Sequence, residues 1–280
     1  MYRRLSLMAS VVVLIAAAAP ATSNAQDWRT ITSLRQFNGE DELRINVQYG
    51  AGTLRIAPGS ASALYRSTLR YDADLFRPLT RYENGELRLG IDGGSVKGRN
   101  MRPARLDLTL GTAVPLDLDL KFGAGEANLD LGGLRVRELR LSTGASQTKI
   151  RAPRANPGEC DEARFEVGAA SFEAIQLGNL NCERYHLSGG VGEVVMDFTG
   201  DLRRQVNVDI DMGLGSLTLR VPRGVGLSVR RSGVLTSFDS EGLVKRGNVY
   251  ESVGYDQSER KLNIDIDAAL GTIRVQWVDQ

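Results

Sequence analysis

The chain of 280 residues is poor in cysteine, histidine and aromatic residues, and it carries almost no net charge. It contains two cysteines, one histidine and two tryptophans, and only 6% of its residues are aromatic. Its 35 basic residues nearly balance its 34 acidic ones, without a marked basic cluster. The charge balance argues against nucleic-acid binding. The single histidine excludes a metal site built from several histidines, and we expect no bound metal or cofactor.

The sequence also lacks a convincing amphipathic helix and a proline-rich or low-complexity linker. A polysaccharide-active solenoid enzyme would need long loops lined with aromatic residues, and these are absent. The two arginine pairs, 203–204 and 230–231, are isolated and fit solvated edges rather than an anionic lipid surface. These absences favour a single β domain without catalytic function.

The first 25 residues have the pattern of an export signal. Arg3 and Arg4 form a charged start, residues 7–19 form an uncharged run of 13, and small residues precede a cleavage point between Ala25 and Gln26. The alternative is a transmembrane anchor, for which the run is short of the ~20 apolar residues needed. We therefore predict an exported protein, periplasmic or secreted, with no stable membrane span after cleavage.

The sequence does contain an internal repeat of β type. Corners of small residues begin at Gly123, Gly144, Gly168, Gly190 and Gly213, which are 21, 24, 22 and 23 residues apart. Related corners occupy residues 50–52 and 269–271. A fixed period of this length indicates stacked supersecondary units that bury a core only together.

Apolar and polar residues alternate before each corner. Leu118, Leu120 and Phe122 alternate with Asp119 and Lys121, for example. A period of two places one set in the core and the other in water. We predict an all-β, single-domain β-solenoid, a single-stranded β-helix with short strands and glycine corners.

The repeat divides the mature chain, residues 26–280, into three parts. Residues 26–114 are expected to form irregular N-terminal strands, 115–225 the regular repeats and 226–280 the C-terminal strands. The Gly- and Arg-rich stretch 93–103 is expected to be a loop and a candidate contact region. Residues 242–254 are also expected to be a loop with an edge that contains Tyr250, and Trp277 is expected to cover the end of the stack.

The two cysteines occupy the same phase of adjacent repeats. Cys160 lies eight residues before Gly168, and Cys182 lies eight residues before Gly190. Neighbouring strands lie ~4.8 Å apart, which suits the Cα separation of a disulfide. We predict a Cys160–Cys182 disulfide, because an exported protein reaches an oxidising compartment in which the bond can form. Two buried thiols are the alternative.

Three aspartate pairs and the single histidine are the remaining candidate functional groups. The pairs are Asp117 and Asp119, Asp209 and Asp211, and Asp265 and Asp267. A calcium site or a set of catalytic carboxylates is one interpretation. Each pair alternates with Leu, Ile or Val, however, and is better explained as the solvent-facing side of a strand. His186 falls at an outward position, so we predict a surface residue rather than a catalytic one.

The repeat phrases resemble those of toastrack β-solenoid domains, which occur in LiaF-like cell-wall-stress proteins and in related bacterial adhesin-like domains of unknown function. The resemblance rests on residues 115–120, 122–126, 129–134, 187–193 and 212–216. It implies a β-solenoid with a binding or regulatory role, and it brings no catalytic residues or cofactor. LiaF-like proteins usually have transmembrane helices before this domain, whereas here a cleavable-looking signal precedes it.

We therefore expect an exported, non-enzymatic interaction or regulatory module at the bacterial cell envelope, in the envelope stress response. Its partner is expected to be a protein or another envelope component. The alternatives are a surface adhesin or matrix protein that binds glycans, and a polysaccharide-active enzyme.

Overall fold

The computed structural model describes residues 27–92, 103–233 and 235–279. The predicted export signal, its cleavage point at Ala25 and Gln26, and residues 93–102 of the predicted contact loop lie outside the described residues. Sixteen strands in the described part form one hydrogen-bonded sheet, which confirms the predicted all-β solenoid class.

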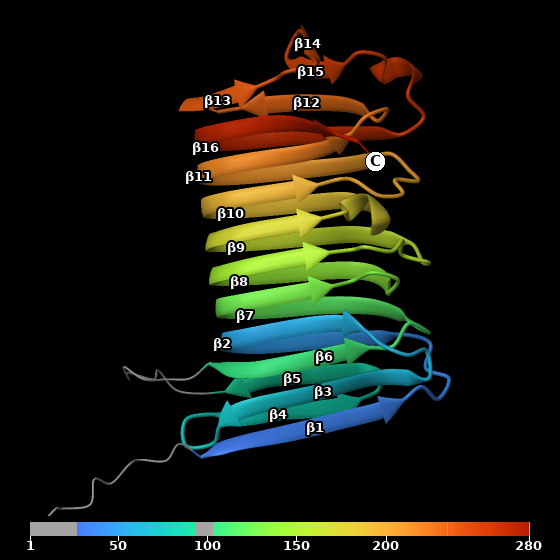
Figure 1. Ribbon diagram of the computed structural model, residues 1–280, viewed down its shortest axis with the longest axis vertical. Coiled ribbons are helices and arrows are strands. Elements are labelled where there is room, and N and C mark those ends of the chain that lie inside the picture. Colours follow the sequence, from blue (N-terminus) through green and yellow to red (C-terminus); the bar gives the residue numbers. More distant parts are fainter. Residues whose placement is uncertain (1–26, 93–102, 234, 280) are drawn as a thin grey trace, which may run out of the picture.

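Seven long strands build the stack, and each bends at its corner so that its two halves lie in two layers (Figure 1). We call each bent strand a rung, the half before the corner its first-layer half and the half after it its second-layer half. The seven are β2 (Leu43–Pro58), β7 (Pro115–Asp130), β8 (Arg135–Arg151), β9 (Cys160–Ile175), β10 (Cys182–Asp197), β11 (Val206–Pro222) and β16 (Lys261–Val278).

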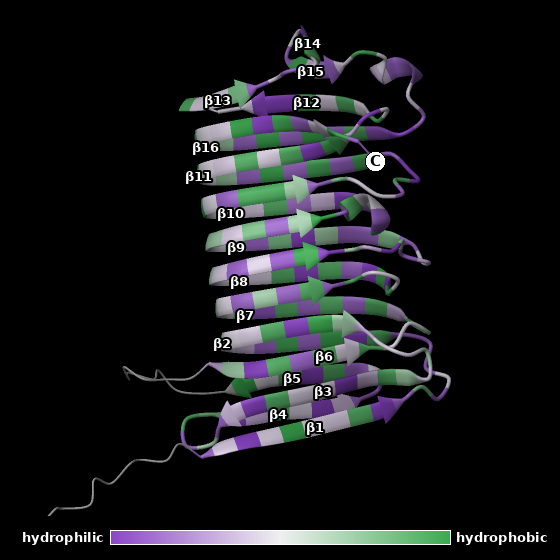
Figure 2. Cartoon of the chain, in the orientation of Figure 1, coloured by the Kyte–Doolittle hydropathy of each residue, from purple (hydrophilic) through white to green (hydrophobic). Residues whose placement is uncertain are grey.

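Neighbouring rungs pair in parallel with equivalent residues opposite one another. Leu118 lies opposite Leu139, for example, and Val208 lies opposite Ile264. The buried apolar residues of both layers form one continuous core. Hydrophobic and hydrophilic residues alternate along the long strands (Figure 2). The period-two pattern therefore predicted correctly which residues face inward.

The N-terminal end of the stack is a rung made of two short strands, covered by antiparallel strands. β5 (Glu86–Asp92) pairs with the first-layer half of β2, and β6 (Ala104–Leu110) pairs with its second-layer half. β4 (Arg77–Glu83) pairs with β5, β3 (Ala63–Asp72) with β6, and β1 (Trp28–Gln36) with β3.

The C-terminal end is built in a similar way from short strands. β12 (Gly226–Ser232) and β13 (Leu235–Asp239) pair with the two halves of β16. The hairpin of β14 (Leu243–Arg246) and β15 (Val249–Ser252) then extends the first layer beyond β12. The predicted loop 242–254 is thus wrong in part, because it contains this hairpin.

The end of the chain lies inside the stack rather than on its end. β16 pairs with β11 on one side and with β12 and β13 on the other. The prediction that Trp277 covers the end of the stack is therefore wrong. Its Nε1 instead donates a hydrogen bond to the carbonyl oxygen of Glu241, 2.9 Å away, which anchors the segment that crosses over it.

The corners require glycine where successive rungs approach most closely. Gly215 has a φ of 149°, and a Cβ there would lie 1.9 Å from the carbonyl oxygen of Gly192 in the rung below. A residue with a side chain fits neither this backbone conformation nor this spacing. The close approach allows the ladder of hydrogen bonds to continue around the bend.

Buried asparagine side chains join the rungs on the opposite, loop-bearing side. Asn156, fully buried, donates from Nδ2 to the carbonyl oxygens of Val136 at 2.7 Å and Leu180 at 3.1 Å. Asn179, within the short 3₁₀ helix Leu177–Asn179, donates to Ala152 in the same way. A second 3₁₀ helix spans Tyr255–Gln257. No helix in the described residues is long and apolar enough to cross a membrane.

Candidate interaction surface

The outward polar face of the first layer contains the best-developed clusters of charged side chains. Because the rungs are in register, outward residues of successive rungs form rows along the stack, about 4.8 Å apart. Two places on this face stand out. One is an ion-pair network on β2, β7 and β8, and the other is a hollow beneath the β14–β15 hairpin.

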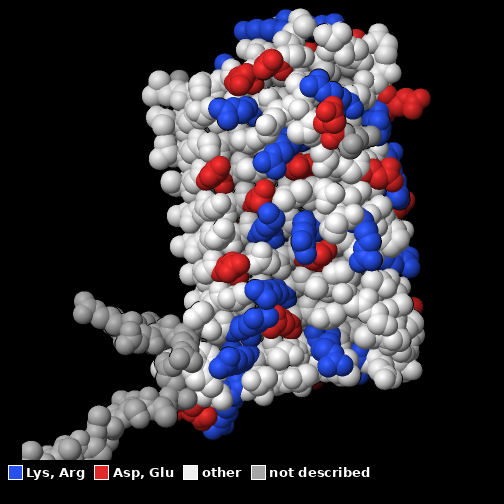
Figure 3. All heavy atoms as spheres, viewed as in Figure 1, with Lys and Arg blue, Asp and Glu red and all other residues white. Residues whose placement is uncertain are grey.

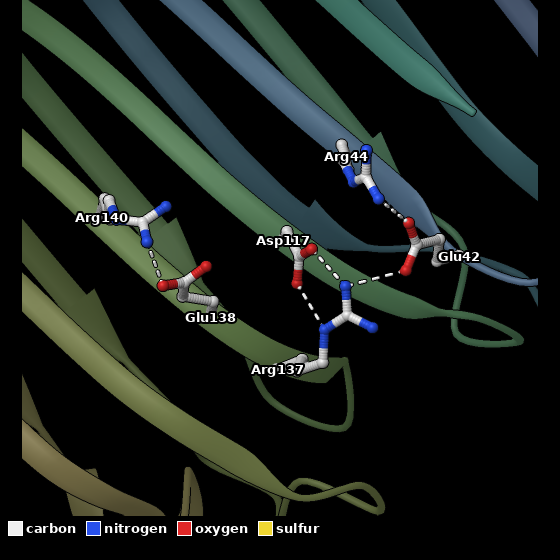
Figure 4. Close-up of polar contacts among 6 residues, drawn as sticks. All are labelled: Glu42, Arg44, Asp117, Arg137, Glu138 and Arg140. Atoms are coloured by element: carbon white, nitrogen blue, oxygen red, sulfur yellow. Dashed lines mark hydrogen bonds and ion pairs between the residues drawn. The ribbon is translucent and has the colours of Figure 1, made fainter. Parts of the chain in front are cut away.

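Arg137 is the centre of the ion-pair network (Figure 4). It is the extra residue of a β-bulge, since the pairing shifts from Leu116 opposite Val136 to Asp117 opposite Glu138. Its guanidinium donates to both carboxylate oxygens of Asp117 and to Glu42 at 2.8 Å. The bulge thereby places one arginine where it joins three neighbouring rungs.

The pairing changes the proton affinities in this network. Hydrogen bonds to Asp117 and then to Glu42 raise the pKa of Arg137 above its ordinary value. The hydrogen bond from Arg137 lowers the pKa of the Glu42 carboxyl group. Arg44 and Arg140 also pair with carboxylates, those of Glu42 and Glu138 (Figure 4). These charges bind one another, so the network acts as a clamp rather than a free binding site.

The hollow has a volume of about 580 Å³ and lies between the first-layer face and the overhanging hairpin. We call it the C-terminal hollow. Its floor comes from outward residues of β11, β16 and β12, and its upper wall from the hairpin. The charged and aromatic residues that line it are Asp209, Asp211, Asp265, Asp267, Arg230, Arg231, Lys245 and Tyr250.

Four carboxylates form the acidic part of the floor. Asp209 lies opposite Asp265, and Asp211 lies opposite Asp267, in the paired strands β11 and β16. Arg230 contacts Asp265 at 3.1 Å, but Asp209 and Asp267 form no ion pair with any described residue. The lining as a whole has four carboxylates and three cations, Arg230, Arg231 and Lys245, so the excess of negative charge is small. The carboxylates of Asp209 and Asp267, which have no ion-pair partner among the described residues, suit a cationic group of a ligand.

The wall of the hollow adds a different chemistry. Lys245 Nζ lies 5.7 Å from the centre of the Tyr250 ring, and the Arg231 guanidinium lies 6.0 Å from the same ring. Both cations face an aromatic surface rather than the carboxylates. Tyr250 itself lies opposite the fully buried Val229, and its ring packs edge-on against Phe238, so the ring belongs to the core side of the hairpin. The site thus combines an acidic floor with a hairpin that contributes Lys245 and Asn248.

The structure places the predicted site residues as follows. Cys160 and Cys182 lie opposite one another at the starts of β9 and β10, are fully buried and are joined by a disulfide. His186 Nε2 lies 4.0 Å from Asp211, with about a quarter of its side chain exposed.

The three aspartate pairs are on the outer face, as the alternation predicted, but they differ in surroundings. Asp117 belongs to the clamp, whereas Asp209, Asp211, Asp265 and Asp267 come together in the hollow. No group of three or more metal-ligating side chains in the described chain has the arrangement to hold a metal ion. The sequence did not reveal the hollow, because its wall comes from a hairpin that folds back over β12.

These features define a two-layered parallel β-solenoid with an inserted strand near each end. Residues 21–173 match the family model of the N-terminal domain of toast_rack, DUF2154. Residues 172–275 match that of the C-terminal region of LiaF, described as a cell wall-active antibiotics response protein. The chain belongs to the toast_rack family, which confirms the resemblance seen in its repeats.

Solved structures give weaker likenesses. A candidate cell adhesion protein from Clostridium sporogenes is 18% identical, with a TM-score of 0.49, over 90% of this chain and 100% of that chain. A candidate adhesin from Bacteroides fragilis is 12% identical, with a TM-score of 0.33, over 88% and 97%. These values carry no inference about function. No curated protein matches the chain.

Proposed function

We propose that this protein is an exported, non-catalytic binding module of the bacterial cell envelope that takes part in the response to cell-wall damage. The observation that carries the proposal is the position of the C-terminal hollow. Its lining residues, from Asp209 to Asp267, fall within the segment that matches the LiaF C-terminal region.

The chemistry of the hollow favours a partner that presents a cationic group. Four carboxylates and three cations line it, and of the carboxylates Asp265 is paired with Arg230, whereas Asp209 and Asp267 form no ion pair with a described residue. A lysine or arginine side chain from a partner protein would pair with Asp209. Charge-assisted hydrogen bonds of this kind are stronger than neutral ones.

Two features support the proposed location outside the cytoplasm. The first 25 residues have the composition of an export signal, with cleavage proposed between Ala25 and Gln26. The disulfide between Cys160 and Cys182 suits an oxidising compartment. Sequencing the N-terminus of the protein recovered from the cell envelope tests the cleavage site directly.

Site-specific photocrosslinking in cells treated with a cell-wall antibiotic tests the binding role. A photoreactive residue replaces Asn248, which is exposed at the hollow, and in a matched control it replaces Arg55, which is exposed on the second layer of β2. We expect a discrete adduct from position 248 only, and its loss when Asp209→Asn is added.

Equal adducts from both positions, or an adduct that Asp209→Asn leaves unchanged, would contradict binding at the hollow. Retention on the outer surface with binding to purified glycans would instead support an adhesin.

A further inference from the structure

The corners of the solenoid form an exposed apolar strip that the clamp and the hollow do not use. The middle residue of each corner points away from the core, and these residues lie in register from β2 to β13. We call this strip the corner ridge. In stack order it consists of Ala51, Ala124, Ala145, Ala169, Val191, Leu214, Leu270 and Leu235.

The ridge carries large aliphatic side chains in open solvent. The exposed fractions are 53% for Val191, 44% for Leu214, 44% for Leu270 and 68% for Leu235. In Figure 3 the left-hand edge of the molecule, above the grey segments, is white, without the blue and red that mark charged residues elsewhere. An uninterrupted row of this kind is typical of a contact surface.

The order of side-chain sizes along the ridge points to its occupant. The four positions nearest the N-terminal end are all alanine, and the four nearest the C-terminal end are all valine or leucine. A second ridge that runs antiparallel to the first would place every large side chain opposite a small one. The pairs would be Ala51 with Leu235, Ala124 with Leu270, Ala145 with Leu214, and Ala169 with Val191.

We propose that the occupant is a second copy of this chain, bound ridge to ridge in an antiparallel, two-fold symmetric dimer. The two-fold axis passes between the β9 and β10 rungs. The spacing of both ridges is the same ~4.8 Å strand spacing, so their side chains stay matched over the whole length. Such a contact is isologous, because both copies use the same patch.

The charges beside the ridge agree with this arrangement. We call the outward residue two positions before each corner its shoulder position. The antiparallel two-fold places the first layers of the two copies side by side, with β7 of one copy opposite β16 of the other. Lys121 and Asp267, each two residues before its corner, then lie on the same side of the contact and across the ridge from one another, twice in the dimer. Both are exposed, and neither forms an ion pair with a described residue of its own chain.

The other shoulder positions bring no like charges together. In the first layer Gln48 would face Ser232, Ser142 would face Asp211, and Glu166 would face Ser188. A parallel dimer would instead place each large side chain against its own copy and leave the alanine halves apart. Volume and charge therefore both favour the antiparallel form.

The size of the contact sets the expected affinity. Eight corners at ~4.8 Å span about 34 Å, and two sheets packed ~10 Å apart give a contact of roughly 340 Å² per copy. This is below the ~800 Å² per partner of a standard interface. The dimer is therefore weak and concentration-dependent, with a dissociation constant above about 10 µM.

Sedimentation velocity over a concentration series, up to about 1 mM of the purified protein, tests for the dimer. The high upper concentration is needed because the expected association is weak. Leu270→Asp is expected to weaken association at least tenfold, because it buries an unpaired carboxylate against Ala124. Val253→Asp is the matched control, since Val253 is 85% exposed in the C-terminal region away from the ridge. A protein that stays monomeric throughout, or a dimer indifferent to Leu270→Asp, would overturn the proposal.

A charge exchange tests the antiparallel orientation. At low ionic strength Lys121→Asp and Asp267→Lys are each expected to weaken association about twofold, because the charges act across the ridge, and the double variant is expected to restore it. In a parallel dimer Lys121 would face Glu126 instead, so the double variant would not recover. That second result would overturn the antiparallel arrangement even if a dimer forms.

A cysteine pair gives an independent reading of the orientation. Under mild oxidation, the double variant Ala145→Cys with Leu214→Cys is expected to link two copies. Leu214→Cys alone is expected to stay unlinked, because the two copies of this position lie about three strand spacings, or ~14 Å, apart. Efficient linking by Leu214→Cys alone would contradict the proposed two-fold.

Discussion

Single side chains connect one rung to the next at three kinds of position. Asn156 replaces missing ladder partners in the loops, Arg137 joins three rungs on the first-layer face, and the disulfide joins the starts of β9 and β10. Each of these side chains holds neighbouring rungs together where the regular strands begin or end. Asn156 also gives backbone carbonyl oxygens there a hydrogen-bond partner. A buried polar group without a partner costs about 1–3 kcal/mol.

The disulfide leads to the first prediction. Replacing both Cys160 and Cys182 by alanine should lower the free energy of unfolding by about 3 kcal/mol, because the bridge closes a loop of about 22 residues in the unfolded chain. Urea unfolding of the variant and the wild type, each with and without reductant, measures the effect. Reductant should lower the midpoint of the wild type only. Alkylation of two thiols in native, unreduced protein would contradict the bridge.

The clamp leads to the second prediction, a dependence of stability on pH. The pKa of Glu42 is lower in the folded protein than its ordinary value, because Arg137 and Arg44 favour the carboxylate. Its contribution is therefore fully present above about pH 4.5 and is lost as the pH falls through the folded-state pKa. The urea midpoint of Glu42→Gln should fall less steeply than that of the wild type below this pH. Parallel curves for the two proteins would contradict the clamp.

At the scale of the strand, alternation and the corners carry most of the structural information in the sequence. The long strands were predictable because each has a full period-two pattern on both sides of a glycine corner. β4 is only weakly marked in the sequence, because it is short, contains Pro78 and has partly exposed side chains on both faces. β14 was missed because its residues are mostly exposed, so that no buried face marks it in the sequence.

The corner leads to the third prediction. Gly215→Ala should destabilise the protein by roughly 3 kcal/mol, because the new Cβ meets backbone of the next rung and the residue has a positive φ. Gly50→Ala is the matched control, since a Cβ there meets nothing within 4 Å. It should change stability by no more than about 0.5 kcal/mol. Thermal unfolding of the two variants measures the difference, and equal losses would contradict the close approach.

At the scale of the whole molecule, the stack does not follow the order of the chain. β2 lies between β7 and the rung of β5 and β6, and β16 lies between β11 and the rung of β12 and β13. The sequence did not predict this order, because alternation specifies which side chains face inward but not which rung is the neighbour. The acidic floor of the hollow follows from the same ordering, since it needs β16 beside β11.

Because β16 lies between β11 and the rung of β12 and β13, both the attachment of that rung and the formation of the hollow depend on β16. The rung of β12 and β13 has no direct pairing with β11, so it joins the stack only after β16 is in place. Such non-local pairing is a slow step in folding.

Amide hydrogen exchange across the chain tests this order of rungs most directly. We predict that the amides of β16 are protected as strongly as those of the central strand β9, because β16 has paired strands on both sides. Those of the edge strand β1 should exchange faster. If β16 exchanges as fast as β1, it is not inserted between β11 and β12, and the account of the fold and of the hollow is wrong.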